Sequence, residues 1–250
     1  NTALQHHPDA VQSVNVDDWS SDHSDQFPRS LGQCSGIKHL VVVDVEDAAV
    51  SDVIHQCIQA SCENLHSLDL FECTDSIVSN IIPAVSSCKQ LEDIAAGQCE
   101  LAPTAGVAMA NSLSGMTSVT SISLSENPDL SDAAVTRIVR ALHQCSGMSK
   151  VEITECGMTS ASLPAITSAL LCWPQLKELS LDGYDFSDMD SDVATDFSAT
   201  LSTLITLPVL SLRHCGLTAR SLPAITTVLQ GCPQLQELRL SRNDFSDMTA

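Results

Sequence analysis

One apolar pattern recurs along almost the whole chain at a nearly constant interval. The pattern is L-x-x-L-x-L-x-x-(N/C)-x-L, with other apolar residues in place of some leucines. Its first position falls at residues 11, 37, 65, 91, 119, 148, 176, 207 and 235, so successive copies lie 26, 28, 26, 28, 29, 28, 31 and 28 residues apart. A fixed period of roughly 20 to 50 residues is the signature of a chain built from stacked structural units.

Each copy is predicted to form a short strand followed by a helix. The L-x-L alternation places apolar residues on one side of a strand, and the segment 162–171 spaces Leu163, Ile166 and Leu170 along one helical face. Pro164 falls in the first helical turn, where its missing N–H costs little. No unit can bury its own apolar face, so the units must stack with parallel strands lining the inner side. The sequence therefore predicts an α/β fold, a right-handed solenoid of eight or nine units with its helices outside.

The repeats divide the chain unevenly. We expect residues 37–250 to form the solenoid, with about eight repeats of which the last is truncated before its helix. Residues 1–36 are expected to be a degenerate first repeat, a cap or a linker, and the degenerate copy would use Val11, Val14, Val16 and Trp19. Because the last copy is truncated and the first residue is not Met, we also expect a piece of a longer protein.

Two long segments match each other at a larger offset. CGMTSASLPAITSALLCWPQLKELSLDGYDFSDMD from Cys156 and CGLTARSLPAITTVLQGCPQLQELRLSRNDFSDMT from Cys215 are 59 residues apart. Paired repeats of this length resemble the ribonuclease-inhibitor subfamily of leucine-rich repeats. Among families with this subtype, the chain looks most like the C-terminal region of a NOD-like receptor. That resemblance implies a module of innate immunity that senses a ligand and restrains the signalling part of its parent.

Two other interpretations remain open. A stand-alone cytosolic inhibitor or scaffold of the ribonuclease-inhibitor type agrees with the paired repeats and the acidic charge, although Trp19, Trp173 and Tyr184 are few aromatic anchors for a tight inhibitor. A GTPase-activating solenoid would need a positioned Arg or Asn that the sequence does not identify.

The eleven cysteines follow the repeat. Cys73, Cys99, Cys156 and Cys215 occupy the N/C position, where an inward side chain bonds the backbone of the turn. Six others stand three or four residues before a repeat begins, namely Cys34, Cys62, Cys88, Cys145, Cys172 and Cys232. Only Cys57 has no such position. We expect small, buried, reduced side chains. The chain has no C-x-x-C pair that would indicate a zinc site, and it has no secretory signal that would indicate disulfides. Reduced cysteines predict a cytoplasmic protein.

The formal charge of −20 argues against two classes of partner. It disfavours nucleic acid and anionic membrane surfaces, and no stretch approaches the roughly 20 apolar residues of a spanning helix. A basic protein partner and a merely solubilising acidic surface both agree with the charge.

No arrangement of residues predicts catalysis. Asp188, Asp190 and Asp192 have the spacing of a calcium loop, but Val193 and Ala199 stand where that loop needs Gly and Glu. We therefore expect a solvated turn that enters a helix. His6, His7 and His23 are expected to be surface residues, and no catalytic or nucleotide-binding motif occurs. The sequence predicts a binding protein with no enzyme activity, metal or cofactor.

The predicted binding surface is the concave face of the sheet, where a protein or microbial ligand would bind. Residues between the apolar strand positions should point away from the core there. The candidate site residues are Asp69, Phe71, Glu72, Lys150, Glu152, Glu155, Arg213, His214, Arg239 and Arg242. This face is predicted to change from acidic to basic along the arc. Phe71 is either an interface anchor or a ring tucked under a neighbour, and the arginines are either a ligand site or a solvated face.

Overall fold

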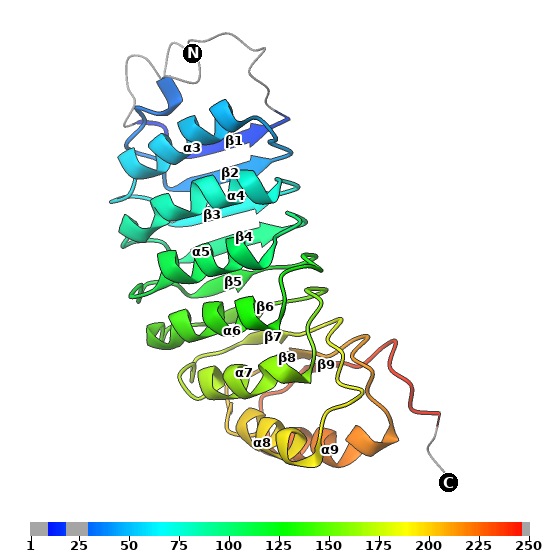
Figure 1. The fold of residues 1–250 in the computed structure, drawn as a ribbon. Helices are drawn as coiled ribbons and strands as arrows, with labels where there is room; N and C mark the ends of the chain where they lie inside the picture. The colour runs from blue at the N-terminus through cyan, green and yellow to red at the C-terminus, as the bar shows by residue number, and fades with distance from the viewer. Residues whose placement is uncertain (1–9, 19–29, 247–250) are drawn as a thin grey trace.

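A single parallel sheet runs the length of the computed structural model, which describes residues 10–18 and 30–246 (Figure 1). Its strands follow one another in chain order. They are β1 (Ser13–Asp17), β2 (His39–Val43), β3 (Ser67–Phe71), β4 (Asp93–Gly97), β5 (Ser121–Ser123), β6 (Lys150–Glu152), β7 (Glu178–Ser180), β8 (Val209–Ser211) and β9 (Glu237–Arg239). The predicted leucine-rich-repeat solenoid, with strands on the concave side and helices outside, is confirmed.

The helices form a second layer on one face of the sheet and leave the other face uncovered (Figure 1). They are α3 (Ala48–Ala60), α4 (Asp75–Ile81), α5 (Pro103–Leu113), α6 (Asp132–Ala141), α7 (Leu163–Leu170), α8 (Ser191–Leu201) and α9 (Leu222–Gly231). Short 3₁₀ segments flank some of them, namely η2 (Ile82–Ser87), η3 (Leu142–Gln144), η4 (Ser160–Ser162) and η5 (Ala219–Ser221).

Local sequence signals set the helix starts. Pro164 lies in the first turn of α7, as predicted. Asp190 caps α8, because its carboxylate accepts hydrogen bonds from the backbone N–H groups of Asp192 and Val193 at 2.9 and 2.8 Å. The acidic run that has calcium-loop spacing is therefore a turn entering a helix, as expected.

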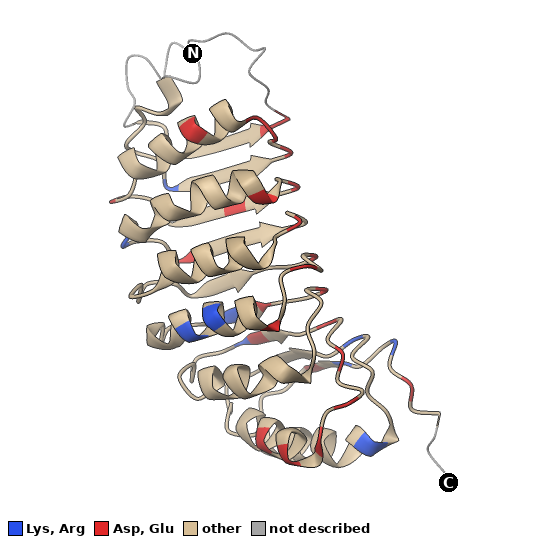
Figure 2. Cartoon of the chain, viewed as in Figure 1, with Lys and Arg blue, Asp and Glu red and all other residues tan. Residues whose placement is uncertain are grey.

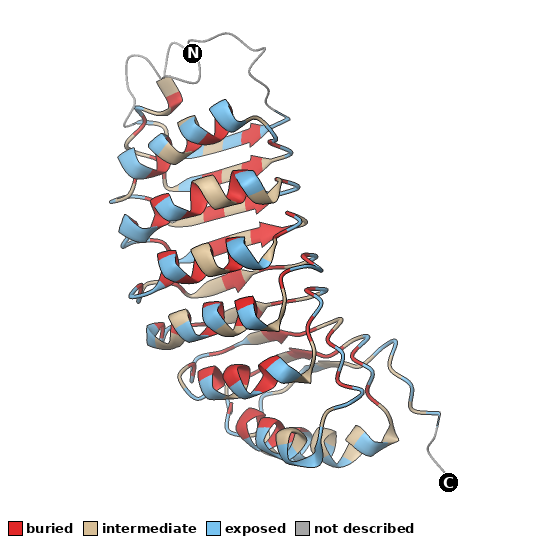
Figure 3. Ribbon diagram, in the orientation of Figure 1, coloured by how far each residue is buried: buried red, intermediate tan, exposed pale blue. Residues whose placement is uncertain are grey.

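The apolar strand residues form continuous stripes between the sheet and the helices (Figure 3). Leu68, Ile94 and Ile122 are buried on neighbouring strands in register. A fully buried side chain of this size contributes about 1.5–3 kcal/mol. Because each stripe is shared between repeats, the stability of one repeat depends on its neighbours.

The N/C position at the end of each strand fixes the following turn. Asn127 is buried, its Oδ1 accepts from the N–H groups of Cys99 and Leu101, and its Nδ2 donates to the carbonyls of Ala96 and Leu124. Asn243, in the last described repeat, makes the same four kinds of bond. Cysteine in this position instead donates to two carbonyls, as the Sγ of Cys215 does to Leu181 and Arg213.

All eleven cysteines are free thiols. Nine are buried, whereas Cys62 and Cys172 are half-buried, so the expectation of buried side chains is wrong for these two. Both follow the end of a helix, where the chain turns at the surface toward the next strand. Burial raises the pKa of Cys57 and Cys156 to about 12, which keeps these thiols protonated at neutral pH.

Candidate recognition face of the sheet

The open side of the sheet, called here the concave face, carries rows of side chains from alternate strand positions. The register places Ser67 beside Asp93 and Asp69 beside Ala95. The middle row contains Asn15, Val41, Asp69, Ala95, Ser123, Glu152, Ser180, Ser211 and Arg239. Ser180, which the alternation predicts to be exposed, is buried. Its short side chain lies between Glu152 and Ser211 on the neighbouring strands.

A further row lies one residue before each N/C position, where the strands end. Its members all have positive φ, from 43° to 77°, and are called here the edge ridge: Asp18, Asp44, Glu72, Gln98, Glu126, Glu155, Gly183, His214 and Arg242. In every member before Arg242, the backbone N–H donates to a carbonyl of the next repeat, as Glu72 does to Gly97 at 3.1 Å and His214 to Ser241 at 3.0 Å. These bonds offset the cost of the left-handed conformation, about 1 kcal/mol for a non-glycine residue.

The edge ridge is acidic over most of its length. Figure 2 shows carboxylates gathered at the loops that follow the strands. Within the ridge, Gln98 donates a hydrogen bond to Glu126 at 2.5 Å. An open depression beside this pair is bordered by Gln98, Glu100, Glu126, Pro128 and Glu155. A negative potential is therefore concentrated along one edge of the sheet.

A hollow lies on the concave face over β3 to β6. It is lined by Ser67, Asp69, Asp93, Ile94, Ala95, Ser121, Ser123, Lys150 and Glu152. The side chains in the middle, Ala95, Ser121 and Ser123, are short. The longer Asp69 and Asp93 border one side, and Lys150 and Glu152 border the other.

Phe71 lies beside this hollow at the end of β3. Its ring is 41% exposed. The ring rests on Gly97 of the next strand, because a Cβ added to that glycine would lie 3.2 Å from the Cδ2 atom of Phe71. The glycine therefore provides the space in which the ring lies across the face.

The electrostatics of the hollow are unfavourable in the free protein. Burial raises the pKa of Asp69, the neighbouring charge of Asp93 raises it further, and His39 offsets part of this effect. No ion pair to either aspartate occurs among residues 10–18 and 30–246. These two carboxylates thus have no ion-pair partner, and the nearby His39 offsets only part of the repulsion at Asp69.

Three cations on the C-terminal part of the concave face are, in contrast, paired with carboxylates. The Nζ of Lys150 lies 3.1 Å from Glu152 and 3.8 Å from Glu178. Arg213 pairs with Asp182 at 3.1 Å. Arg239 pairs with Glu237 at 2.6 Å. The predicted change from acidic to basic along the arc is therefore offset locally, because each of these cations has an acidic neighbour.

Glu155 and His214 meet across a glycine. The Oε1 of Glu155 lies 3.7 Å from the Nδ1 of His214. Gly183 stands between them on the edge ridge with φ of 77°, and a Cβ there would come within 2.7 Å of the Glu155 carboxylate. Glycine is required here both by its backbone conformation and by the carboxylate above it.

The structure separates the ten candidate residues into distinct groups. Asp69 borders the hollow on one side, and Lys150 and Glu152 border it on the other. Phe71 stands two residues after Asp69, at the end of β3, where it pairs with Gly97. Glu72, Glu155, His214 and Arg242 belong to the edge ridge. Arg213 and Arg239 lie on the C-terminal part of the face in ion pairs. Asp93 is not among the predicted site residues, yet it also lines the hollow, because the register of β3 with β4 places it beside Ser67.

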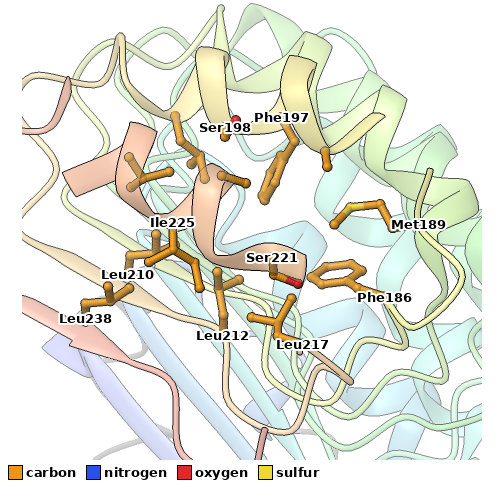
Figure 4. Close-up of a pocket in the computed structure, with 14 residues that line it drawn as sticks. Phe186, Met189, Phe197, Ser198, Leu210, Leu212, Leu217, Ser221, Ile225 and Leu238 are labelled. Atoms are coloured by element: carbon orange, nitrogen blue, oxygen red, sulfur yellow. The ribbon is translucent and has the colours of Figure 1, made fainter. Parts of the chain in front are cut away.

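A small apolar pocket lies between α8, α9 and the last strands (Figure 4). Phe186, Phe197, Leu212, Ile225 and Leu238 are among the residues that line it. Its volume of about 40 Å³ is far below the roughly 300 Å³ of a ligand pocket. It is therefore a gap in the packing of the last two repeats.

Two features are absent from residues 10–18 and 30–246, the part of the chain that the structure describes. No group of His, Cys, Asp or Glu suited to hold a metal ion occurs there. No helix in those residues is long and apolar enough to cross a membrane.

The chain is similar in sequence to ribonuclease inhibitors. It is 27% identical to that of Sus scrofa over 164 residues, which make up 65% of this chain and 35% of the inhibitor. It is 30% identical to that of Mus musculus over 118 residues, or 47% of this chain and 25% of the inhibitor. The chain thus spans about a third or less of these relatives.

No protein-family model matches the chain. Among solved structures, the C-terminal domain of tropomodulin from Caenorhabditis elegans is 15% identical, with a TM-score of 0.45, and the match covers 58% of this chain and 89% of that domain.

Proposed function

We propose that the chain is a protein-recognition module whose concave face and edge ridge bind a basic protein. The observation that carries the proposal is the excess of carboxylates on an uncovered sheet face whose cations Lys150, Arg213 and Arg239 are already paired. The similarity to ribonuclease inhibitors, whose name gives ribonuclease as their target, supports a protein partner.

The physics of association favours such a partner. An acidic surface attracts a basic one over long range and raises the rate of encounter. The sheet is held by backbone pairing from β1 to β9, so little ordering is needed when a partner binds. Partner identity would then depend on which charges face each other across the interface.

The proposal is tested by binding a basic ribonuclease and egg-white lysozyme to the immobilised chain over a range of salt concentrations. We expect the Kd to rise steeply with salt, because screening weakens charge attraction. Glu72→Lys with Glu126→Lys, on the edge ridge, should weaken binding. Glu63→Lys with Asp196→Lys changes charge equally on exposed positions of the helical side and is the matched control.

Equal weakening by both double variants would contradict binding through the ridge. Absence of salt-dependent binding to either basic protein would contradict recognition of basic proteins altogether. Inhibition of RNA hydrolysis by the ribonuclease, measured in the same series, tests whether binding also blocks that enzyme.

A more specific proposal concerns the kind of protein to which this chain belongs. The resemblance of the paired repeats to NOD-like receptors supports a sensing region of an innate immune receptor, and the alternative is a stand-alone inhibitor or scaffold. The mass of the native protein under reducing conditions distinguishes them. A mass several times 26.6 kDa is expected for the receptor, whereas a mass only a few repeats larger would favour the inhibitor.

A cytosolic location belongs to the same proposal. Its support is the free state of all eleven cysteines, since reducing compartments keep thiols reduced. Cell fractionation, with detection by an antibody raised against this chain, tests it, and recovery in the secretory fraction would contradict it.

A further inference from the structure

The hollow over β3 to β6 has a volume of about 440 Å³, so it has ample room for one long side chain of a partner. Its middle is low because Ala95, Ser121 and Ser123 are short, and its border is made of longer charged residues. The strands below are in register, so this shape is set by side-chain length and not by a distortion of the sheet. An extended or looped segment of a partner would place one side chain here.

The charge of the hollow selects a cation. Asp69 and Asp93 are diagonal neighbours, since Asp93 pairs in register with Ser67, two residues before Asp69. Lys150, on the far side, is held by Glu152 and Glu178 and makes no ion pair with either aspartate. A cation supplied by a partner would relieve the repulsion that contributes to the raised pKa of Asp69.

The neighbouring ring distinguishes between cations. Phe71 follows Asp69 on the same side of β3, lies against Gly97, and is 41% exposed. An aromatic face attracts cations and packs against the stem of a long side chain. Arginine stacks on aromatic rings and presents five N–H donors in one plane, whereas lysine carries a compact and strongly hydrated charge.

We propose that this hollow binds one arginine side chain of the partner, with the guanidinium between Asp69 and Asp93 and the side-chain stem against Phe71. The inference rests on the proposed function, because it specifies the chemistry by which a basic protein is recognised. It commits to arginine over lysine, which general attraction to an acidic surface does not.

The test uses two fluorescent peptides that differ only in carrying three arginines or three lysines. Their Kd values for the whole chain are measured by fluorescence anisotropy at physiological ionic strength. We expect the arginine peptide to bind roughly fivefold more tightly. Phe71→Ala and the double variant Asp69→Asn with Asp93→Asn should each abolish this preference, while Phe71→Trp should retain it.

The matched control is Glu126→Gln with Glu155→Gln. It removes the same two charges as the aspartate variant, but from the edge ridge outside the hollow. It should weaken both peptides equally and leave the arginine preference intact. Unchanged circular dichroism spectra verify that the variants are folded, as expected for substitutions on an exposed face.

The outcomes separate this inference from the proposed function. Equal affinity for both peptides, or a preference that survives Phe71→Ala, would overturn the arginine site while leaving recognition of basic proteins in place. Failure to bind either peptide, with salt-dependent binding of the basic proteins retained, would also overturn it. Loss of binding to the peptides and the proteins together would contradict both.

Discussion

Replacing Asn127 by alanine should destabilise the protein far more than the same change at Asn243. Asn127 is buried and its amide bonds two backbone N–H groups and two carbonyls where the chain leaves β4 and β5. Alanine leaves all four groups without these partners. At about 1 kcal/mol for each lost bond, the expected loss of unfolding free energy is about 4 kcal/mol.

Asn243 provides a matched control because it makes the same four bonds near the end of the array. It is only half-buried, so water can replace much of what the amide supplies. We expect a loss of about 1–2 kcal/mol there. The loss of unfolding free energy for Asn127→Cys should lie between those of the two alanine variants, because cysteine in this position of other repeats still donates to a strand carbonyl.

The assay is urea unfolding followed by far-ultraviolet circular dichroism and by tryptophan fluorescence. Trp173 is buried and donates to the carbonyl of Leu142, so its fluorescence reports on the middle repeats. Coincident transitions would justify a two-state treatment. A loss at Asn127→Ala no larger than at Asn243→Ala would refute the idea that this amide holds the turn.

Three further predictions concern the recognition face. The pKa of Asp69 is raised in the folded protein above its ordinary value of 3.8, so stability is lost as pH rises from the ordinary pKa through the raised one. Asp69→Asn should therefore raise Tm at pH 7, and a gain in Tm that persists at acid pH would contradict this cause. Gly183→Ala should lower the unfolding free energy, measured in urea, by about 2 kcal/mol or more. In a background that carries Glu155→Ala, the same change should cost only about 1 kcal/mol, the cost of the positive φ alone, and additive effects of the two substitutions would contradict the contact. Phe71→Ala should change unfolding free energy by less than about 1 kcal/mol, because the ring is 41% exposed, and a loss above about 2 kcal/mol would mean that it belongs to the core.

The repeat pattern predicts the fold well because strand positions follow directly from apolar spacing. Leu68, Ile94 and Ile122 are predicted as inward residues and are buried. The roles of Asn127 and the cysteines before each turn were also predictable, because their position in the repeat determines where the side chain points. Cys62 and Cys172 depart from expectation because the helix ends beside them are partly open to solvent.

The site was less predictable, because its features depend on contacts between repeats. The ion pair of Arg213 with Asp182 joins residues on successive repeats, and single-repeat patterns do not reveal it. Likewise, the position of Phe71 on Gly97 depends on the register of β3 with β4. Positive φ at Glu72 and Glu155 has a usable signal, since each such residue directly precedes an N/C position.

The edge ridge has a consequence for how such a protein changes over evolutionary time. Its backbone conformation is held by N–H bonds to the following repeat, which are the same whether the residue is Glu72, Gln98 or His214. Substitution among polar residues at ridge positions other than Gly183 therefore leaves the fold almost untouched while it alters the charge presented at regular intervals of about 4.8 Å. New partners can therefore be acquired through single mutations in one repeat at a time, and such mutations do not first require a more stable scaffold.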